Sequence, residues 1–136
     1  MKDQTLRRAA AVALALTGVI HLVLAPEYMA EQAYIGLLFI GGGITTIALA
    51  AWLWVRSEPV AWVGAALVSA GMAAGFILSR TVGLPGFHEA EWELSGVVSV
   101  LLEIGVVGLA AAALGSGGSA RTATSARASS RSATSR

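Results

Sequence analysis

Two ionisable side chains lie inside long apolar runs of this chain, and they are the residues best suited to chemistry. Glu103 lies well inside the last of four apolar runs, and His21 lies near the end of the first. An ionised carboxylate in apolar surroundings needs a partner, a cavity or a proton. A carboxyl group and an imidazole held close together can pass a proton, attract a cation or supply two metal ligands.

Hydroxyl side chains share the helix faces of both residues. Ser99 precedes Glu103 by one helical turn, as Thr17 precedes His21. The first and last helices of an up-and-down bundle are neighbours. We therefore expect Thr17, His21, Ser99 and Glu103 to form a buried polar cluster, with Arg80 closing its outer edge. One interpretation is a proton or cation pathway through Glu103, His21 and Arg80, and the other is a structural clasp between helices.

A second group of polar residues lies in the two links on the side opposite the termini. This predicted acidic rim consists of Glu27, Glu31, His88, Glu89, Glu91 and Glu93. Carboxylate oxygens suit Ca²⁺ or Mg²⁺, and imidazole suits transition metals, so His21, Glu31 and His88 are candidate metal ligands. The spacing matches neither HExxH nor an EF-hand loop. A solvated acidic loop accounts for the same residues, and the sequence requires no cofactor.

Four apolar runs are long enough to cross a bilayer and must position these residues. About 20 helical residues at ~1.5 Å each span a hydrocarbon core of ~30 Å. The chain has 136 residues, of which 56% are hydrophobic and 12% charged, so little is left for a soluble domain. We predict an all-α, integral membrane, antiparallel four-helix bundle over residues 1–115. The spans are predicted at residues 9–25, 33–54, 60–79 and 95–115.

The first run follows a basic start, as in a secretory signal. Cleavage after Ala25 would place Pro26 at the cut, and cleavage after Ala30 would put the bulky Tyr28 close before it. Signal cleavage sites require small residues at these positions. We therefore interpret the first run as an uncleaved membrane span.

Basic residues are distributed unevenly along the chain. They precede the first run, occur at Arg56 in the middle link and recur in the tail, whereas Arg80 stands alone on the other side. The positive-inside rule then predicts a multi-pass plasma-membrane protein with cytoplasmic N- and C-termini. Residues 116–136 are low-complexity Ser, Ala, Thr and Arg, and we predict a disordered tail. Such a basic tail is attracted to anionic lipid, but it has no aromatic residue with which to stack on nucleic acid.

Small residues indicate where helices can approach closely. Gly41–Gly43 lies in the second span, and Gly71 and Gly75 have GxxxG spacing in the third. In lipid, such faces pack within a bundle, against a membrane-protein partner or against a second copy of the chain. Between the third and fourth spans, the sequence from Gly83 to Gly86 is typical of a turn.

Two sequence patterns are similar to a known group of proteins. They are HLxLAPExxxE from His21 to Glu31 and SRTxGLPG from Ser79 to Gly86. The chain resembles an uncharacterised family of small four-span membrane proteins of high-GC bacteria over about residues 10–110. The resemblance implies the four-span fold and supplies no reaction. Histidine often occupies the position of Tyr28 in that family, so a family metal site would lack one ligand here.

No pattern in the sequence names a reaction. The interpretation we favour is a non-enzymatic accessory or assembly subunit with a buried His–Glu cluster. A proton or cation pathway through Glu103, His21 and Arg80 is the first alternative. A membrane-embedded metal-binding protein or enzyme is the second, and it is ranked last because ligand number and spacing are poor.

Overall fold

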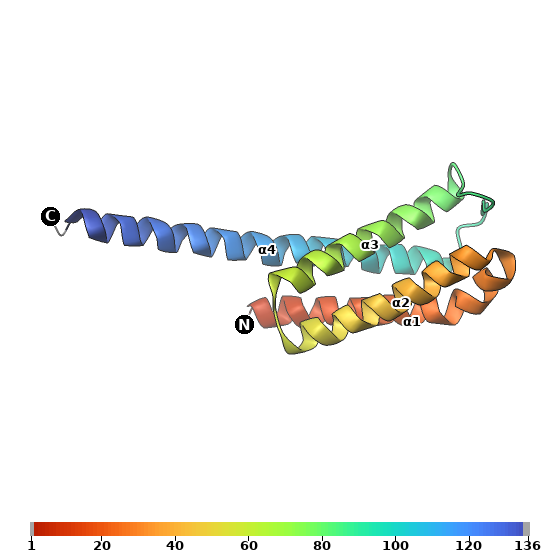
Figure 1. Ribbon diagram of the computed structural model, residues 1–136, viewed down its shortest axis with the longest axis horizontal. Helices are drawn as coiled ribbons and strands as arrows, with labels where there is room; N and C mark the ends of the chain where they lie inside the picture. The colour runs from red at the N-terminus through yellow and green to blue at the C-terminus, as the bar shows by residue number, and fades with distance from the viewer. Residues whose placement is uncertain (1, 135–136) are drawn as a thin grey trace.

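Four antiparallel α-helices make up the computed structural model, which describes residues 2–134 (Figure 1). Each helix packs against its neighbours in the chain, and the last packs against the first to close the bundle. The prediction of an all-α four-helix fold is confirmed. The helices are α1 (Lys2–Glu31), α2 (Ala33–Val55), α3 (Pro59–Arg80) and α4 (Leu94–Thr134).

The connections define two ends of the bundle. The loop end holds the link at Gln32 and the loop of residues 81–93. The tail end holds the start of α1, the short turn at residues 56–58 and the point where α4 leaves the bundle (Figure 1). Because the helices are antiparallel, the acidic links lie at the loop end and the basic segments at the tail end.

The predicted turn from Gly83 to Gly86 is confirmed. Both glycines have positive φ angles, 84° and 65°, which residues with a side chain rarely adopt. Leu84 and Phe87, on either side of Pro85 and Gly86, pair through two backbone hydrogen bonds of 2.7 and 2.9 Å. The turn folds the loop back over the end of the bundle, where Tyr34 donates a hydrogen bond to the Pro85 carbonyl oxygen.

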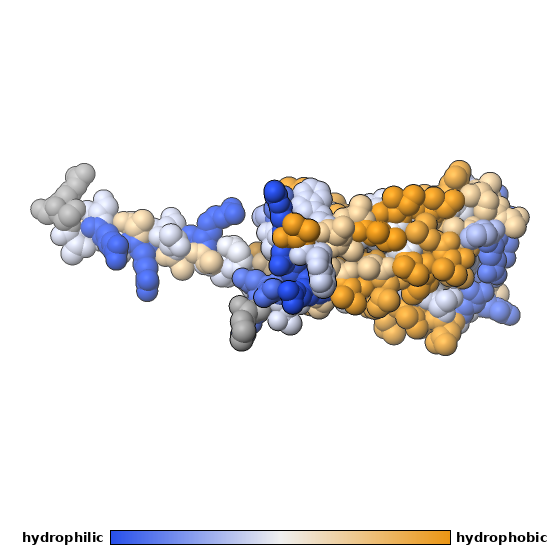
Figure 2. Space-filling view, turned by 90° about the horizontal axis from the view of Figure 1, so that it is seen from below, coloured by the Kyte–Doolittle hydropathy of each residue, from blue (hydrophilic) through white to orange (hydrophobic). Residues whose placement is uncertain are grey.

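The outer surface of the bundle is apolar. All four helices are long and apolar enough to cross a membrane, and a third or less of each apolar stretch is buried inside the bundle. Hydrophobic side chains form a broad band between polar regions at the two ends (Figure 2). Val23, Leu37, Leu67 and Leu101 are each at least 60% exposed in this band. Exposed apolar surfaces of this extent mark contact with a membrane or with another protein.

The first helix continues past Pro26, where the predicted first span ended. Proline removes one backbone hydrogen bond from a helix. Here the following turn is held by packing, because Tyr28 is 4% exposed and the backbone of Met29 lies against Gly36 of α2. The helix therefore reaches Glu31, and Tyr28 becomes part of the bundle instead of the link.

Close approach of α1 and α2 depends on two glycines. A Cβ atom on Gly18 would lie 2.9 Å from the Gly43 carbonyl oxygen, and one on Gly43 would lie 3.0 Å from that of Gly18. By contrast, a Cβ on Gly41, Gly71 or Gly75 would meet open space. The expectation that Gly71 and Gly75 pack within the bundle is therefore wrong, and their packing against a partner stays a prediction.

The tail differs from the predicted disordered segment. Residues 116–134 continue α4 as a helix, and every side chain in this segment is exposed. The alanine and arginine residues of this segment have high helix propensity. Helix propensity thus outweighs low complexity in this segment, although nothing in the bundle packs against it.

Candidate functional site

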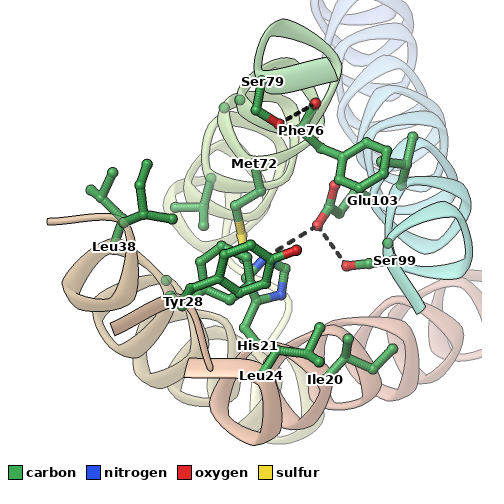
Figure 3. A pocket seen from close by; sticks show the side chains of 18 of the residues that line it. Ile20, His21, Leu24, Tyr28, Leu38, Met72, Phe76, Ser79, Ser99 and Glu103 are labelled. Atoms are coloured by element: carbon green, nitrogen blue, oxygen red, sulfur yellow. Dashed lines mark hydrogen bonds and ion pairs between the residues drawn. The ribbon is translucent and has the colours of Figure 1, made fainter. Parts of the chain in front are cut away.

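The structure brings the predicted His–Glu pair together. His21 of α1 and Glu103 of α4 face each other, with 3.9 Å between His21 Nε2 and Glu103 Oε1 (Figure 3). The Glu103 side chain is 2% exposed and that of His21 12%. This distance exceeds that of a hydrogen bond, so the contact is an ion pair when both groups are charged. It exists because the first and last helices are antiparallel neighbours.

Two residues one helical turn away orient this pair, Ser99 through its hydroxyl group and Thr17 through its backbone carbonyl group. Ser99 donates a hydrogen bond of 2.9 Å to Glu103 Oε1, and His21 Nδ1 lies 2.9 Å from the Thr17 carbonyl oxygen. A carbonyl oxygen can only accept, so His21 Nδ1 carries a proton and Nε2 is the atom turned toward Glu103. Phe39 of α2 packs on the imidazole, with the ring centroids 4.8 Å apart. Thr17, His21, Ser99 and Glu103 therefore form one polar cluster.

Glu103 has one oxygen left over. Its Oε2 is buried and has no hydrogen-bond partner among residues 2–134. A buried polar atom without a partner costs about 1–3 kcal/mol. In native structures such an atom calls for an explanation, such as a bound water or ion. Glu103 Oε2 is thus the open position of the polar cluster.

Arg80 belongs to a second polar group at the loop end. Its guanidinium donates to Tyr28 Oη at 3.1 Å, to Ser79 Oγ at 2.8 Å and to the Glu91 carbonyl oxygen at 3.2 Å. It also lies over the Phe76 ring, 4.1 Å from the centroid. Arg80 is 9% exposed, and in the described chain no carboxylate lies within ion-pair distance of it. Arg80, predicted to close the outer edge of the polar cluster, lies at the loop end of a cavity that Glu103 also lines, and contacts Tyr28 there.

A cavity of about 370 Å³ joins the two polar groups. All four helices line it, and Glu103 and Arg80 are both lining residues. Figure 3 shows Glu103 facing the cavity. The rest of the wall is mostly apolar, and includes Ile20, Leu24 and Met72. Pockets that bind small molecules have this size and this pattern of apolar walls with a few polar groups.

Apolar packing closes the cavity toward the tail end. Leu14, Leu53 and Val106 are fully buried there, and Trp62 is 3% exposed. They belong to one hydrophobic cluster that contains residues of all four helices. The cavity is therefore confined to the half of the bundle near the loop end.

The predicted acidic rim gathers at the loop end, outside the cavity. Glu27, Glu31, His88 and Glu91 are exposed, and Glu89 and Glu93 are half-buried. Partial burial, and then the negative charge of Glu31, raise the pKa of Glu89 above its ordinary value, while Arg80 opposes this effect. The carboxylates of Glu31 and Glu89 therefore repel each other within the rim.

The candidate metal ligands do not form a metal site. His21 is inside the bundle beside Glu103, whereas Glu31 and His88 are exposed at the loop end. Over residues 2–134, no three His, Cys, Asp or Glu side chains gather closely enough to hold a metal ion. The three residues therefore do not act as one ligand set in this structure.

Sequence reasoning missed the aromatic residues of the site. Tyr28 stacks on Phe39 at 4.3 Å and meets Phe87 edge-on at 5.8 Å between ring centroids. Tyr28 was assigned to the link because Pro26 precedes it. Its spacing of seven residues from His21, two helical turns, is the signal that would have placed it on the same face.

Comparisons with known proteins give no relative for this chain. No protein-family model, no curated protein and no solved structure matches it. The function is therefore inferred from the site alone.

Proposed function

We propose that this protein crosses the plasma membrane four times, with both termini in the cytoplasm, and binds a small molecule in the cavity at Glu103 and His21. The apolar band around the bundle supports insertion (Figure 2). Lys2, Arg7, Arg8 and Arg56 lie in the segments of the tail end, and the acidic links lie at the loop end, which supports the orientation. The cavity then lies in the outer half of the membrane.

The unpartnered oxygen of Glu103 is the observation that carries this proposal. It is buried in a cavity of about 370 Å³ whose other walls are mostly apolar. Ser99 already occupies the other carboxyl oxygen. A ligand with a hydrogen-bond donor would remove the cost of the unpartnered oxygen and gain apolar contacts. Binding without a reaction agrees with an accessory role.

A proton or cation pathway is the second candidate function, and the His21–Glu103 pair favours it. Conduction also requires a polar route from the cavity to the tail end. Leu14, Leu53 and Val106 fill that route with apolar side chains. Transport would therefore need a second conformation in which this core opens.

Native mass spectrometry of protein released from mild detergent tests binding. Wild-type protein should carry a non-covalent small-molecule adduct. Gly75→Phe should lose the adduct, because Gly75 lines the cavity and has open space for a side chain. Gly108→Phe is the matched control, because Gly108 has similar space but does not line the cavity. Equal adducts in all three proteins would contradict the proposal, as would their absence from wild type.

Proton flux into reconstituted vesicles separates the two candidates. Vesicles holding a pH-sensitive dye are placed in a pH gradient with a potassium ionophore to balance charge. Wild-type protein should leak no faster than protein-free vesicles, because the core at the tail end is closed. A flux that Glu103→Gln abolishes would favour the pathway and overturn the proposal of a binding protein.

A further inference from the structure

The cavity opens sideways between α2 and α3. Among the residues that line it, the exposed ones are Leu38 and Thr45 of α2 and Leu67 and Gly71 of α3. The lining residues of α1 and α4 are all buried or half-buried. Toward the loop end, α3 diverges from α2 (Figure 1). The gap between Leu38, Leu67 and Gly71 therefore opens on the apolar outer surface, which faces lipid in the proposed topology.

In contrast to the side between α2 and α3, the loop end of the cavity is closed. Tyr28 is stacked on Phe39, and its hydroxyl accepts a hydrogen bond from Arg80. Arg80 in turn is held against Phe76 and by the Glu91 carbonyl oxygen. Entry from water would have to break several of these contacts, whereas entry from the side meets none of them.

The side chain of Met72 faces Gly42 across the gap between α2 and α3. Its Cε atom lies 3.1 Å from the position that a Cβ on Gly42 would occupy. Methionine is unbranched and adapts its shape at low cost, so it can move aside for an apolar chain. A Cβ on Gly71, the residue before Met72, would meet open space. The gap can therefore widen without moving a helix.

The charges in the cavity restrict the head of the ligand. Arg80 is always protonated, so it disfavours a cationic head. The carboxyl group of Glu103 disfavours an anionic head beside it. Glu103 Oε2 needs a hydrogen-bond donor, and a hydroxyl group is an uncharged donor of suitable size. The volume of about 370 Å³ holds such a head and the first part of a chain.

We propose that the ligand is an uncharged lipid-soluble alcohol that enters from the bilayer between α2 and α3 and donates its hydroxyl hydrogen bond to Glu103. The remainder of its chain leaves through the gap into the lipid. This inference rests on the proposed binding function and adds the class of ligand and its route.

Photolabelling in phosphatidylcholine vesicles tests both additions. The probes are diazirine derivatives of hexadecanol, hexadecane and hexadecanoate, which differ only in the head. Labels are mapped by mass spectrometry on Ile20, Leu24 and Val100, which line the cavity, relative to lipid-facing Leu101 and Ile104. The alcohol should label the cavity residues about tenfold more than the alkane or the acid, as one buried hydrogen bond predicts.

Substitutions separate the head from the route. Glu103→Leu should reduce the preference for the alcohol over the alkane to near unity, while labelling of Leu101 and Ile104 stays the same. Gly71→Leu should reduce labelling of the cavity by every probe, because leucine fills the gap. Gly108→Leu is the control, because it adds the same side chain on a surface away from the cavity.

Each outcome decides a separate point. Equal labelling by alcohol and alkane in wild type would overturn the hydroxyl assignment. Unchanged labelling in Gly71→Leu would overturn the sideways route and leave binding intact. Cavity residues labelled no more than Leu101 by any probe would overturn the binding function itself. If Glu103→Leu does not fold, unlabelled hexadecanol must still compete about tenfold better than hexadecane in wild type.

Discussion

Replacing Gly43 by alanine should destabilise the bundle, whereas the same change at Gly41 should not. The two glycines belong to the same triplet in α2. A Cβ on Gly43 would lie 2.8 Å from Leu22 Cγ and 3.0 Å from the Gly18 carbonyl oxygen, while one on Gly41 meets open space. Leu22 can change rotamer, but the Gly18 carbonyl moves only if α1 moves.

The magnitude follows from two opposing effects. Overpacking a well-packed contact costs about 1–3 kcal/mol, and replacing glycine by alanine within a helix gains up to ~1 kcal/mol. Gly43→Ala should therefore lose about 1–2 kcal/mol of unfolding free energy, and Gly41→Ala should gain up to ~1 kcal/mol. Gly18→Ala, whose Cβ would lie 2.9 Å from the Gly43 carbonyl oxygen, should resemble Gly43→Ala.

Titration of the protein in mild detergent with sodium dodecyl sulfate, followed by circular dichroism, measures these differences. The midpoint should fall for Gly18→Ala and Gly43→Ala and stay level or rise for Gly41→Ala. Equal shifts for Gly41→Ala and Gly43→Ala would refute the reasoning. In that case the glycines would act through the flexibility of α2 and not through its contact with α1.

Four further predictions concern the two ends of the bundle. Arg80→Met should cost about 1–3 kcal/mol in the same titration, because the buried hydroxyl groups of Tyr28 and Ser79 lose their donor. Arg56→Met should cost less than ~1 kcal/mol, because its ion pair with Glu58 is exposed. Burial raises the pKa of Glu89 above 4.5, so its ionisation destabilises the fold as pH rises through that range. Glu89→Gln should therefore raise the melting temperature at pH 7 and not at pH 4, and equal shifts at both would contradict this. Truncation after Gly115 should remove the helical circular dichroism of residues 116–134, and an unchanged helix signal per molecule would show a disordered tail.

Hydropathy was sufficient to predict the fold of residues 2–115. Each apolar run became a helix, and their antiparallel order placed His21 beside Glu103. Two helices extend beyond the predicted spans for physical reasons. Packing of Tyr28 holds α1 together beyond Pro26, and helix propensity extends α4 beyond Gly115. Local composition alone predicted neither the extension of α1 nor that of α4.

The cavity could not be predicted from the sequence. The spacing of Ser99 and Glu103 indicated a shared face, but the empty volume beside them depends on how far α3 diverges from α2. The contact of Arg80 with Tyr28 was also missed, because Tyr28 was assigned to the link after the first span. Gly71 was interpreted as a packing surface, although the structure leaves it beside an open gap.

The length of α4 has a consequence for the tail. Beyond the bundle the helix runs on as a straight rod (Figure 1). At ~1.5 Å per residue, Arg131 lies roughly 24 Å past Gly115, and Arg121 only about 9 Å. Screening at physiological ionic strength has a range of about 8 Å. A rod perpendicular to the membrane would thus keep most of its arginines out of reach of anionic lipid, and only a bend at Gly117–Gly118 would lay them on the surface.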